Sequence, residues 1–338
     1  MKNRAASLLM LLAGSLILGG CGSGSQAGEP LPGDPNPPPG GTNPFTGRIV
    51  AEGTAKVHTI DLGASGEWTV RLDSSVYEVI AVHEPENELF TANATFGSPL
   101  TVRTHDLDNF ALTDTFLWPD SEERDYGRVH SLAVSTDGSH FAAVISGVGD
   151  AFLEIVNRET KEVRFSGFLG MASSDLYWLS DDLLVMTAHT PDPANNLAGA
   201  IVAVSLDELA SGSGTVNMTL LVRFNEDEWA ISTPADFSFS HDRSQIAYAY
   251  NSDIWVKNLE DDSPPRQLTT GPTGLVGPVF SPDGSHLALV EYQFHSLRHT
   301  FVIPNHRADP VFIDGTSAGT EAWLLEARTL VDTMLLWQ

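Results

Sequence analysis

Cysteine and basic residues are scarce in this sequence. The 338-residue chain has one cysteine, so it cannot form an internal disulfide or a zinc site built from several thiolates. It has 18 Lys and Arg against 44 Asp and Glu, a formal net charge of −26. Nucleic-acid binding needs a basic surface to neutralise phosphates, so we expect no nucleic-acid partner. A hydrophobic content of 42% is enough for a folded core and argues against global disorder.

The apolar run near the start of the chain is too short to span a membrane. Residues 5–18 are apolar apart from Ser7, Gly14 and Ser15, and Lys2 and Arg4 precede them. A membrane span needs about 20 apolar residues, whereas a short basic segment, an apolar run and small residues are typical of an export signal. We therefore predict a signal peptide over residues 1–20 and no transmembrane helix in the mature chain.

The predicted cleavage site, Leu18-Gly19-Gly20-Cys21, resembles the lipobox of bacterial lipoproteins. In that family the cysteine thiol is joined to diacylglycerol, the signal is cut just before it, and the new amino end is acylated. The resemblance implies that Cys21 is lipidated and that the protein is anchored in the cell envelope, because two or more acyl chains anchor stably. Gly22 in place of Asp implies the periplasmic face of the outer membrane if the cell is Gram-negative. The alternative, a buried free cysteine in an uncleaved helix, is disfavoured by the surrounding glycines.

Residues 21–47 lack any hydrophobic periodicity. After Cys21 they are almost entirely Gly, Ser, Pro, Asn and Thr, with a Pro-rich centre over 30–39. Such a segment is expected to be extended at its centre and to form no packed element. We interpret it as a linker that holds a lipid-anchored domain away from the bilayer. The alternative is a Pro-rich ligand for a partner's groove.

Residues 48–338 contain repeated strand–turn–strand segments. Three align well, each an apolar strand, a turn centred on Asp and a second apolar strand: 132–145, 237–250 and 278–291. The Asp-Gly pairs at 137–138 and 283–284 are strong hairpin signals because glycine tolerates a positive φ. Weaker copies occupy 79–92, 176–188 and 323–334.

Further strands follow each hairpin, as in 152–167 and 253–270, so each unit has the four strands of a propeller blade. The sequence predicts an all-β, six-bladed β-propeller over residues 48–338, with seven blades or a stacked sandwich as alternatives. We expect the last blade to be composite, with two strands from 320–338 and two from 56–72. Such closure removes exposed sheet edges.

The segments FSPDGSHLALV and FSFSHDRSQIAYAYNSDIWVKNLED resemble the WD40-like "PD40" repeat of TolB-type propellers. The resemblance implies the propeller fold and an envelope location. The chain departs from TolB itself, because it carries a lipobox and lacks room for a separate N-terminal α/β domain. The resemblance therefore does not transfer TolB's partners.

In a propeller, the turns between strands one and two and between three and four share one face, here called the short-turn face. The two–three and four–one connections share the opposite face, called the long-loop face because its expected members are the insertions 117–128, 189–199, 225–234 and 292–300. Aromatic anchors ringed by charged groups are typical of a binding patch, and loops on a rigid scaffold often carry recognition. Self-packed aromatics in solvated loops are the alternative. The candidate binding residues are Trp118, Asp120, Asp125, Tyr126, Arg128, Asp227, Trp229 and Arg298.

Metal ligation is a weaker expectation. Imidazoles at His295 and His299, or oxygens from Asp192 and Asn195, could meet only if their loops turn suitably. His140 and His286 follow turn glycines in two repeats and are interpreted as repeat-encoded surface positions and not as ligands. We therefore expect no cofactor, with Ca²⁺ or another divalent cation as the alternative.

The sequence lacks the motifs of the common enzymes sought. No GxSxG joins a strand to a helix, and no Walker or dinucleotide fingerprint follows a strand. The favoured hypothesis is a non-enzymatic, lipid-anchored scaffold that binds an envelope protein through the long-loop face. The alternatives are a metal-assisted hydrolase, lyase or lactonase, or a small-ligand or glycan receptor at the channel mouth. The acidic charge could steer a basic partner or a cation, or reflect a salty habitat.

Replacing Cys21 with Ala tests the anchor. We expect the Cys21→Ala protein to be lost from the membrane fraction, because without the thiol there is no attachment point for diacylglycerol. Fractionation of envelopes followed by immunoblotting measures the change, and Ser23→Ala serves as the matched control that stays with the membrane. A Cys21→Ala protein that remains in the membrane pellet would contradict the lipoprotein assignment.

Overall fold

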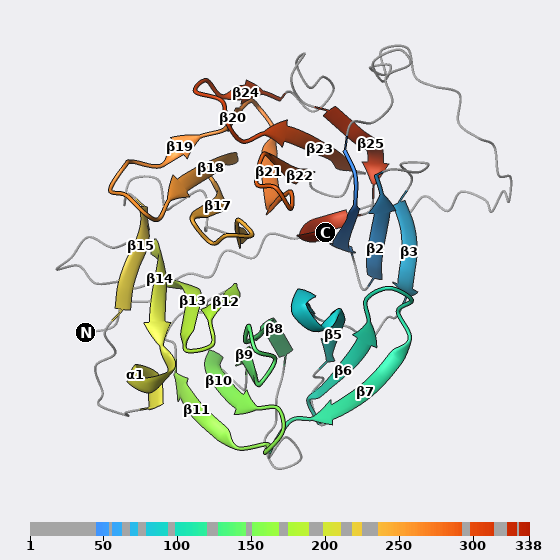
Figure 1. The fold of residues 1–338 in the computed structure, drawn as a ribbon, viewed down its shortest axis with the longest axis vertical. Helices are drawn as coiled ribbons and strands as arrows, with labels where there is room; N and C mark the ends of the chain where they lie inside the picture. Colours follow the sequence, from blue (N-terminus) through green and yellow to red (C-terminus); the bar gives the residue numbers. More distant parts are fainter. Residues whose placement is uncertain are drawn as a thin grey trace, which may run out of the picture. The chain divides into compact units, whose positions relative to one another are not determined.

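Short β-strands make up nearly all the regular structure in this computed structural model (Figure 1). The structure describes residues 45–338 except 54–55, 63–67, 74–78, 94–98, 120–127, 147–150, 169–174, 189–198, 211–217, 225–235, 293–297, 314–322 and 330. Cys21 and the predicted signal peptide and linker therefore lie almost wholly outside the described residues. Among the described residues, no helix is long and apolar enough to cross a bilayer.

Six four-stranded antiparallel sheets follow one another around a ring (Figure 1). Blade 1 contains β4 (Val79–His83), β5 (Glu88–Asn93), β6 (Thr101–Asp106) and β7 (Leu112–Leu117). Blade 2 contains β8 (Arg128–Val134), β9 (His140–Ser146), β10 (Ala151–Asn157) and β11 (Val163–Phe168). Blade 3 contains β12 (Leu176–Ser180), β13 (Leu183–Ala188), β14 (Gly199–Ser205) and β15 (Met218–Phe224), with the short helix α1 (Leu206–Ala210).

The other three blades complete the circle. Blade 4 contains β16 (Phe237–Phe239), β17 (Gln245–Tyr250), β18 (Asp253–Asn258) and β19 (Arg266–Gln267). Blade 5 contains β21 (Gly274–Phe280), β22 (His286–Tyr292), β23 (Arg298–Pro304) and β25 (Trp323–Thr329). The closing blade contains β26 (Val331–Trp337), β1 (Arg48–Gly53), β2 (Lys56–Asp61) and β3 (Trp68–Asp73). The six-bladed propeller predicted from the repeats is thus confirmed.

The strand composition of the closing blade differs from the sequence prediction. The C-terminus supplies one strand, β26, and the N-terminus supplies three, because β1 lies between β26 and β2. β25 instead pairs with β23 as the fourth strand of blade 5. Residues 323–334 are therefore not a hairpin. The strand that could have filled that place, β24 (Val311–Phe312), pairs in parallel with β20 (Thr269–Thr270).

Ring closure depends on backbone pairing between the two ends of the described chain. Arg48 N–H donates to Gln338 O at 2.8 Å, and Gln338 N–H donates back to Arg48 O at 2.9 Å. The indole of Trp337 donates to Thr46 O at 3.1 Å and packs edge-on against Phe45, with ring centroids 5.8 Å apart. Both rings are buried. Because of this seam, β1 is an interior strand of the closing blade, with β26 on one side and β2 on the other.

Each of the six interfaces between blades has its own hydrophobic cluster in the described part of the chain. Strands near the centre are covered by a blade on each side, so they read as continuous apolar runs. β9 is an example, with five consecutive buried residues. Outer strands face solvent, and β7 has four exposed residues before Phe116. This packing places the first strand of every blade around the axis.

A repeated hydrogen-bonded turn joins the first two strands in blades 2, 4 and 5. In blade 5, Ser281 Oγ donates to Asp283 Oδ1 at 2.7 Å, and Ser285 N–H donates to the same oxygen at 3.0 Å. His286 N–H donates to Ser281 Oγ at 3.0 Å. The turn residue Gly284 has a φ of +70°, which confirms the glycine signal read from the sequence. Ser135–His140 and Ser240–Gln245 repeat the arrangement.

These turns also set the ionisation of their carboxylates. Hydrogen bonds from Ser281, and then from Ser285, lower the pKa of Asp283 to about 2. Bonds from Ser240 and Ser244 lower the pKa of Asp242 to about 2. The ordinary pKa of an Asp carboxyl is 3.8. The ionised carboxylates of these turns therefore stabilise the fold above about pH 4, and this stabilisation is lost as the pH falls toward 2.

We predict that Asp283→Asn lowers the free energy of unfolding by about 1 kcal/mol at neutral pH, because hydrogen bonds to a charged acceptor are weakened. The variant should also lose less stability than the wild type between pH 4 and pH 2. Urea unfolding at several pH values measures both effects. The exposed Asp309 of the same blade provides the control, Asp309→Asn. An equal change in the two variants would contradict the role assigned to the turn.

Candidate functional site

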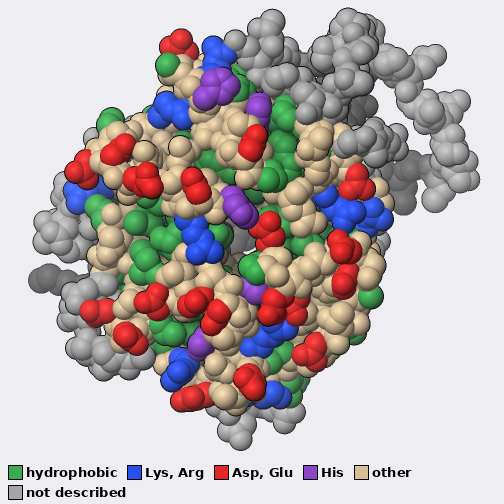
Figure 2. All heavy atoms as spheres, viewed as in Figure 1, with side chains coloured by type: hydrophobic (Ala, Val, Ile, Leu, Met, Phe, Trp, Pro, Cys, Tyr) green, Lys and Arg blue, Asp and Glu red, His purple; other side chains and the backbone are tan. Residues whose placement is uncertain are grey.

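The described residues form a central channel. It has a volume of about 660 Å³, and its wall comes from β4, β8, β12, β16, β21 and β26, the first strands of the six blades. Turn residues of the short-turn face also line it, including Glu84, Thr136, His241 and Arg243. Acidic side chains are spread over the whole face seen in Figure 2, with basic and histidine side chains between them.

Hydrogen bonds hold some of these lining residues between neighbouring blades. Arg243 Nη1 donates to Leu179 O at 2.6 Å, which joins the turn of blade 4 to blade 3. Tyr177 of β12 packs on Phe239 of β16, with ring centroids 4.6 Å apart. Burial raises the pKa of the Tyr177 phenol, so this group stays protonated at neutral pH. The channel wall is therefore built from groups already fixed by contacts across the blades.

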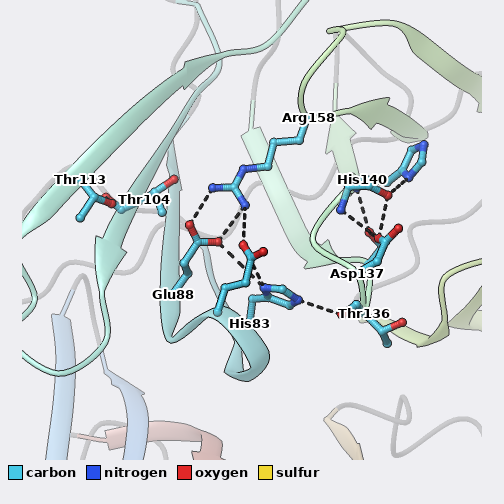
Figure 3. A network of polar contacts seen from close by, with 11 residues as sticks. His83, Glu88, Thr104, Thr113, Thr136, Asp137, His140 and Arg158 are labelled. Carbon is cyan, nitrogen blue, oxygen red and sulfur yellow. Dashed lines mark hydrogen bonds and ion pairs between the residues drawn. The ribbon is translucent and has the colours of Figure 1, made fainter.

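A network of charged residues lies beside the channel where blade 1 meets blade 2 (Figure 3). Arg158 donates two hydrogen bonds to Glu88, both at 2.8 Å, and lies 3.7 Å from Glu86. The guanidinium also stacks over the Phe90 ring at 5.1 Å. The hydrogen bonds to Glu88 raise the pKa of Arg158, which keeps the guanidinium charged. Such bidentate pairs are geometrically specific, so this one fixes Glu88 in place.

His83 joins the same network from the end of β4. The side chain is 4% exposed, and its Nε2–H donates to Thr136 O at 3.0 Å (Figure 3). Its Nδ1 faces Glu86 at 4.0 Å and Glu88 at 3.9 Å. Gly138 of blade 2 lies against the ring, and a Cβ added there would sit 3.0 Å from His83 Cε1. Two turns of the short-turn face are thus fitted together around one imidazole.

The structure places few of the sequence-predicted binding residues. Arg128 is exposed at the start of β8, and Arg298 begins β23, so both strands start at the long-loop face. The other binding candidates, apart from Trp118, lie outside the described residues: Asp120, Asp125, Tyr126, Asp227 and Trp229.

Trp118 is a core residue, which corrects its assignment as a surface anchor. It is 1% exposed and packs with Phe116 and Phe141 between blades 1 and 2. Its indole donates to Glu154 Oε2 at 2.8 Å, and Ser166 Oγ donates to Glu154 Oε1 at 2.9 Å. The buried carboxylate thus accepts hydrogen bonds from two strands, and the tryptophan's polar atom is used inside the protein.

Only one of the metal-site candidates is described. His299 lies on β23, where its Nδ1 is 2.5 Å from Oε2 of the fully buried Glu291. His295, Asp192 and Asn195 lie outside the described residues. His140 and His286 occupy equivalent positions in two repeats, where each Nδ1 contacts the preceding serine hydroxyl, but both side chains are half-buried and not surface residues as the sequence predicts. Burial lowers the pKa of both imidazoles.

The cluster of His83, Glu86, Glu88 and Arg158 is the main feature that the sequence reasoning did not find. The sequence marks residues 79–92 only as a weak copy of the repeat. The sequence does carry a signal, because this copy has His83 where the well-formed repeats have Ser and Pro85 where they have Asp. Arg158 is far away in sequence, so its part in the cluster required the fold.

Comparison with solved structures places the fold of this chain among known β-propellers. TolB from Acinetobacter baumannii superposes with a TM-score of 0.54 and 15% identity, covering 86% of this chain and 66% of the TolB chain. The fold is TolB-like. The PD40 resemblance is confirmed at the level of the fold, and this TolB-like propeller spans about two thirds of the TolB chain that it matches.

A chain from a nidogen/laminin complex superposes on the TolB-like propeller with a TM-score of 0.57. The two sequences are 12% identical, and the superposition covers 86% of this chain and 97% of the chain from the nidogen/laminin complex. At such identities the likeness concerns the fold alone. No protein-family model matches the sequence, and a search of curated proteins finds no significant relative.

The close fit around His83 can be tested with a pair of glycine variants. Gly138 and Gly284 occupy equivalent turns with φ values of +73° and +70°, but an added Cβ at 284 has no neighbour within 4 Å. Both alanine variants should lose about 1 kcal/mol to backbone strain. Gly138→Ala should lose about 1 kcal/mol more, because the new methyl displaces His83. Chemical denaturation measures the difference, and equal losses would contradict the packing described.

Proposed function

We propose that this protein is a lipid-anchored component of the bacterial envelope that binds another protein through its long-loop face. The observation that carries the proposal is the connectivity of the blades. β7 to β8 and β15 to β16 are four–one connections, whereas β13 to β14 and β22 to β23 are two–three connections. In an antiparallel blade these two kinds of connection emerge on the same face, so all four predicted insertions start and end there.

The envelope location is supported by the N-terminal sequence and the fold. The lipobox-like residues ending at Cys21 supply an attachment point, and the Pro-rich linker supplies reach. TolB, to which the propeller is similar, comes from a bacterium. A tethered propeller with a net charge of −26 is repelled by an anionic bilayer, which favours exposure of its faces.

Protein recognition is the function that a scaffold of this kind supports best. The six cores and the β26–β1 seam give a rigid platform, and loops on rigid platforms commonly carry recognition. A structurally similar chain occurs in a nidogen/laminin complex, so a propeller of this shape can serve in a protein–protein complex. Tyr126 and Trp229 remain the proposed aromatic anchors, because buried aromatics carry much of the binding energy of interfaces.

Site-specific photocrosslinking in living cells tests the proposal. A photoreactive phenylalanine analogue in place of Tyr126 or Trp229 should give a discrete crosslinked adduct with one envelope protein. The matched controls replace Glu159 and Glu260, which lie in exposed three–four turns of the short-turn face. These positions should give no such adduct.

Two results would overturn the proposal. The first is the absence of any adduct from both long-loop positions when the protein is present at its normal level. The second is the same adduct from the long-loop and the short-turn positions, which would show that the contacts are not selective for a face.

A further inference from the structure

The turn between β4 and β5 differs from the turns at the same place in other blades. Blades 2, 4 and 5 have serine at the end of the first strand, where Ser135, Ser240 and Ser281 pair with a residue five positions later. In blade 1 the corresponding residue is His83, which pairs with Glu88. The Ser–Asp–Ser hydrogen bonds are absent from this described turn, and imidazole and carboxylate groups take their place. A repeat that departs from its own stabilising pattern suggests a local function.

The Nδ1 atom of His83 faces the carboxylates of Glu86 and Glu88. A backbone carbonyl can only accept a hydrogen bond, so the contact with Thr136 O requires the proton to be on Nε2. In the neutral imidazole Nδ1 then carries a lone pair, and this nitrogen is fully buried and has no hydrogen-bond partner among the described residues. A buried nitrogen left without a partner is destabilising. Histidine held by a carbonyl on one nitrogen is also the usual arrangement of a metal ligand.

The carboxylates of Glu86 and Glu88 complete a three-residue cluster with this nitrogen. One oxygen from each and the imidazole nitrogen all lie within 4.8 Å of one another. Tetrahedral zinc ligands at 2.0–2.2 Å from the ion are about 3.4 Å apart. The observed separations of 3.9 and 4.0 Å from His83 Nδ1 therefore need to shorten by only about half an ångström. Glu86 is 55% exposed and free to make most of this movement.

Arg158 lies beside the cluster, with Nη1 2.8 Å from Glu88 Oε2 and 3.7 Å from Glu86 Oε2, and leaves lone pairs on Glu88 available. Its guanidinium uses one lone pair on each oxygen of Glu88, and a carboxylate oxygen has a second lone pair available for an ion. Ligating carboxylates are commonly hydrogen-bonded in this way. With two carboxylates and one guanidinium, the three charged side chains keep an excess of one negative charge.

We propose that His83 Nδ1, Glu86 and Glu88 bind a divalent transition-metal ion, with Zn²⁺ as the best match, at the junction of blades 1 and 2. Imidazole and carboxylate together suit Zn²⁺, whereas Ca²⁺ and Mg²⁺ prefer oxygen ligands alone. Three protein ligands leave a fourth position for water or for an anionic group of a ligand. The ion reaches the site from the side of the exposed Glu86, on the short-turn face beside the channel.

Calorimetric titration of the purified, chelator-treated protein with ZnCl₂ tests this proposal. We expect one equivalent to bind with a dissociation constant in the micromolar range or below, and Ca²⁺ to bind more weakly. Glu86→Gln should weaken Zn²⁺ binding at least about 10-fold. His83→Asn should abolish it. Co²⁺ bound in place of Zn²⁺ should show the visible absorption of a low-coordinate site, and His83→Asn should remove that absorption.

Glu84→Gln is the matched control. Glu84 is the neighbouring acid, it is 44% exposed, and its carboxylate points toward His241, 3.9 Å away, and not into the cluster. This variant should bind Zn²⁺ like the wild type. If His83→Asn disturbs folding, Glu86→Gln still decides the matter, because the Glu86 side chain is half exposed. No stoichiometric Zn²⁺ binding by the wild type, unchanged binding by Glu86→Gln, or tighter binding of Ca²⁺ would each overturn the proposal.

Discussion

The pairing of β26 with β1 is the constraint on which the rest of the structure depends. Five blades are each made from one continuous stretch of chain, but the closing blade needs strands from both ends. Without β26, the inner strand of that blade is missing, and the clusters it shares with blades 5 and 1 are opened. The channel also loses one of its six walls. The positions of His83, Arg158 and the channel residues all presuppose a closed ring.

Buried polar contacts between blades add specificity to this hydrophobic packing. Apolar clusters alone allow small sliding movements, whereas a directional bond permits one arrangement. The hydrogen bond from His83 to Thr136 and the pair formed by Arg158 and Glu88 join blades 1 and 2. Trp118 and Glu154 join the same blades closer to the outer strands. The interface beside the candidate metal cluster is therefore held by three separate polar contacts, which keeps its geometry fixed.

The sequence was sufficient to predict the architecture, because the local signals of a propeller are strong. Asp-Gly turns between apolar strands mark hairpins, and their spacing gives the number of blades. It was insufficient for the closing blade. β1 and β26 lie at opposite ends of the described chain. No hairpin turn connects them, so the local sequence does not indicate that they pair. The prediction for Trp118 was wrong because the local sequence of an aromatic residue at a strand end does not distinguish a solvent-facing side chain from one that packs against a neighbouring blade.

The candidate site was out of reach for a related reason. His83, Glu86 and Glu88 are neighbours in sequence, but the hydrogen bonds to Thr136 and from Arg158 depend on how two blades pack. Sequence periodicity describes one blade at a time and carries no information about such contacts. The departure of residues 83–88 from the Ser–Asp–Ser pattern indicates where to look, and only the fold shows what the departure achieves.

The seam has a consequence for how the chain acquires its structure. The Trp337–Thr46 contact spans 291 residues, whereas contacts within the other blades are local. The entropic cost of loop closure grows only slowly with loop length, so the length of this loop destabilises the seam little. Contacts between residues so distant in sequence nevertheless form late in folding. During synthesis, which starts at the N-terminus, β1, β2 and β3 are made first, whereas their inner neighbour β26 is made last. These three strands therefore form an incomplete sheet until β26 has been synthesised, and during this interval the chain is exposed to mispairing and proteolysis.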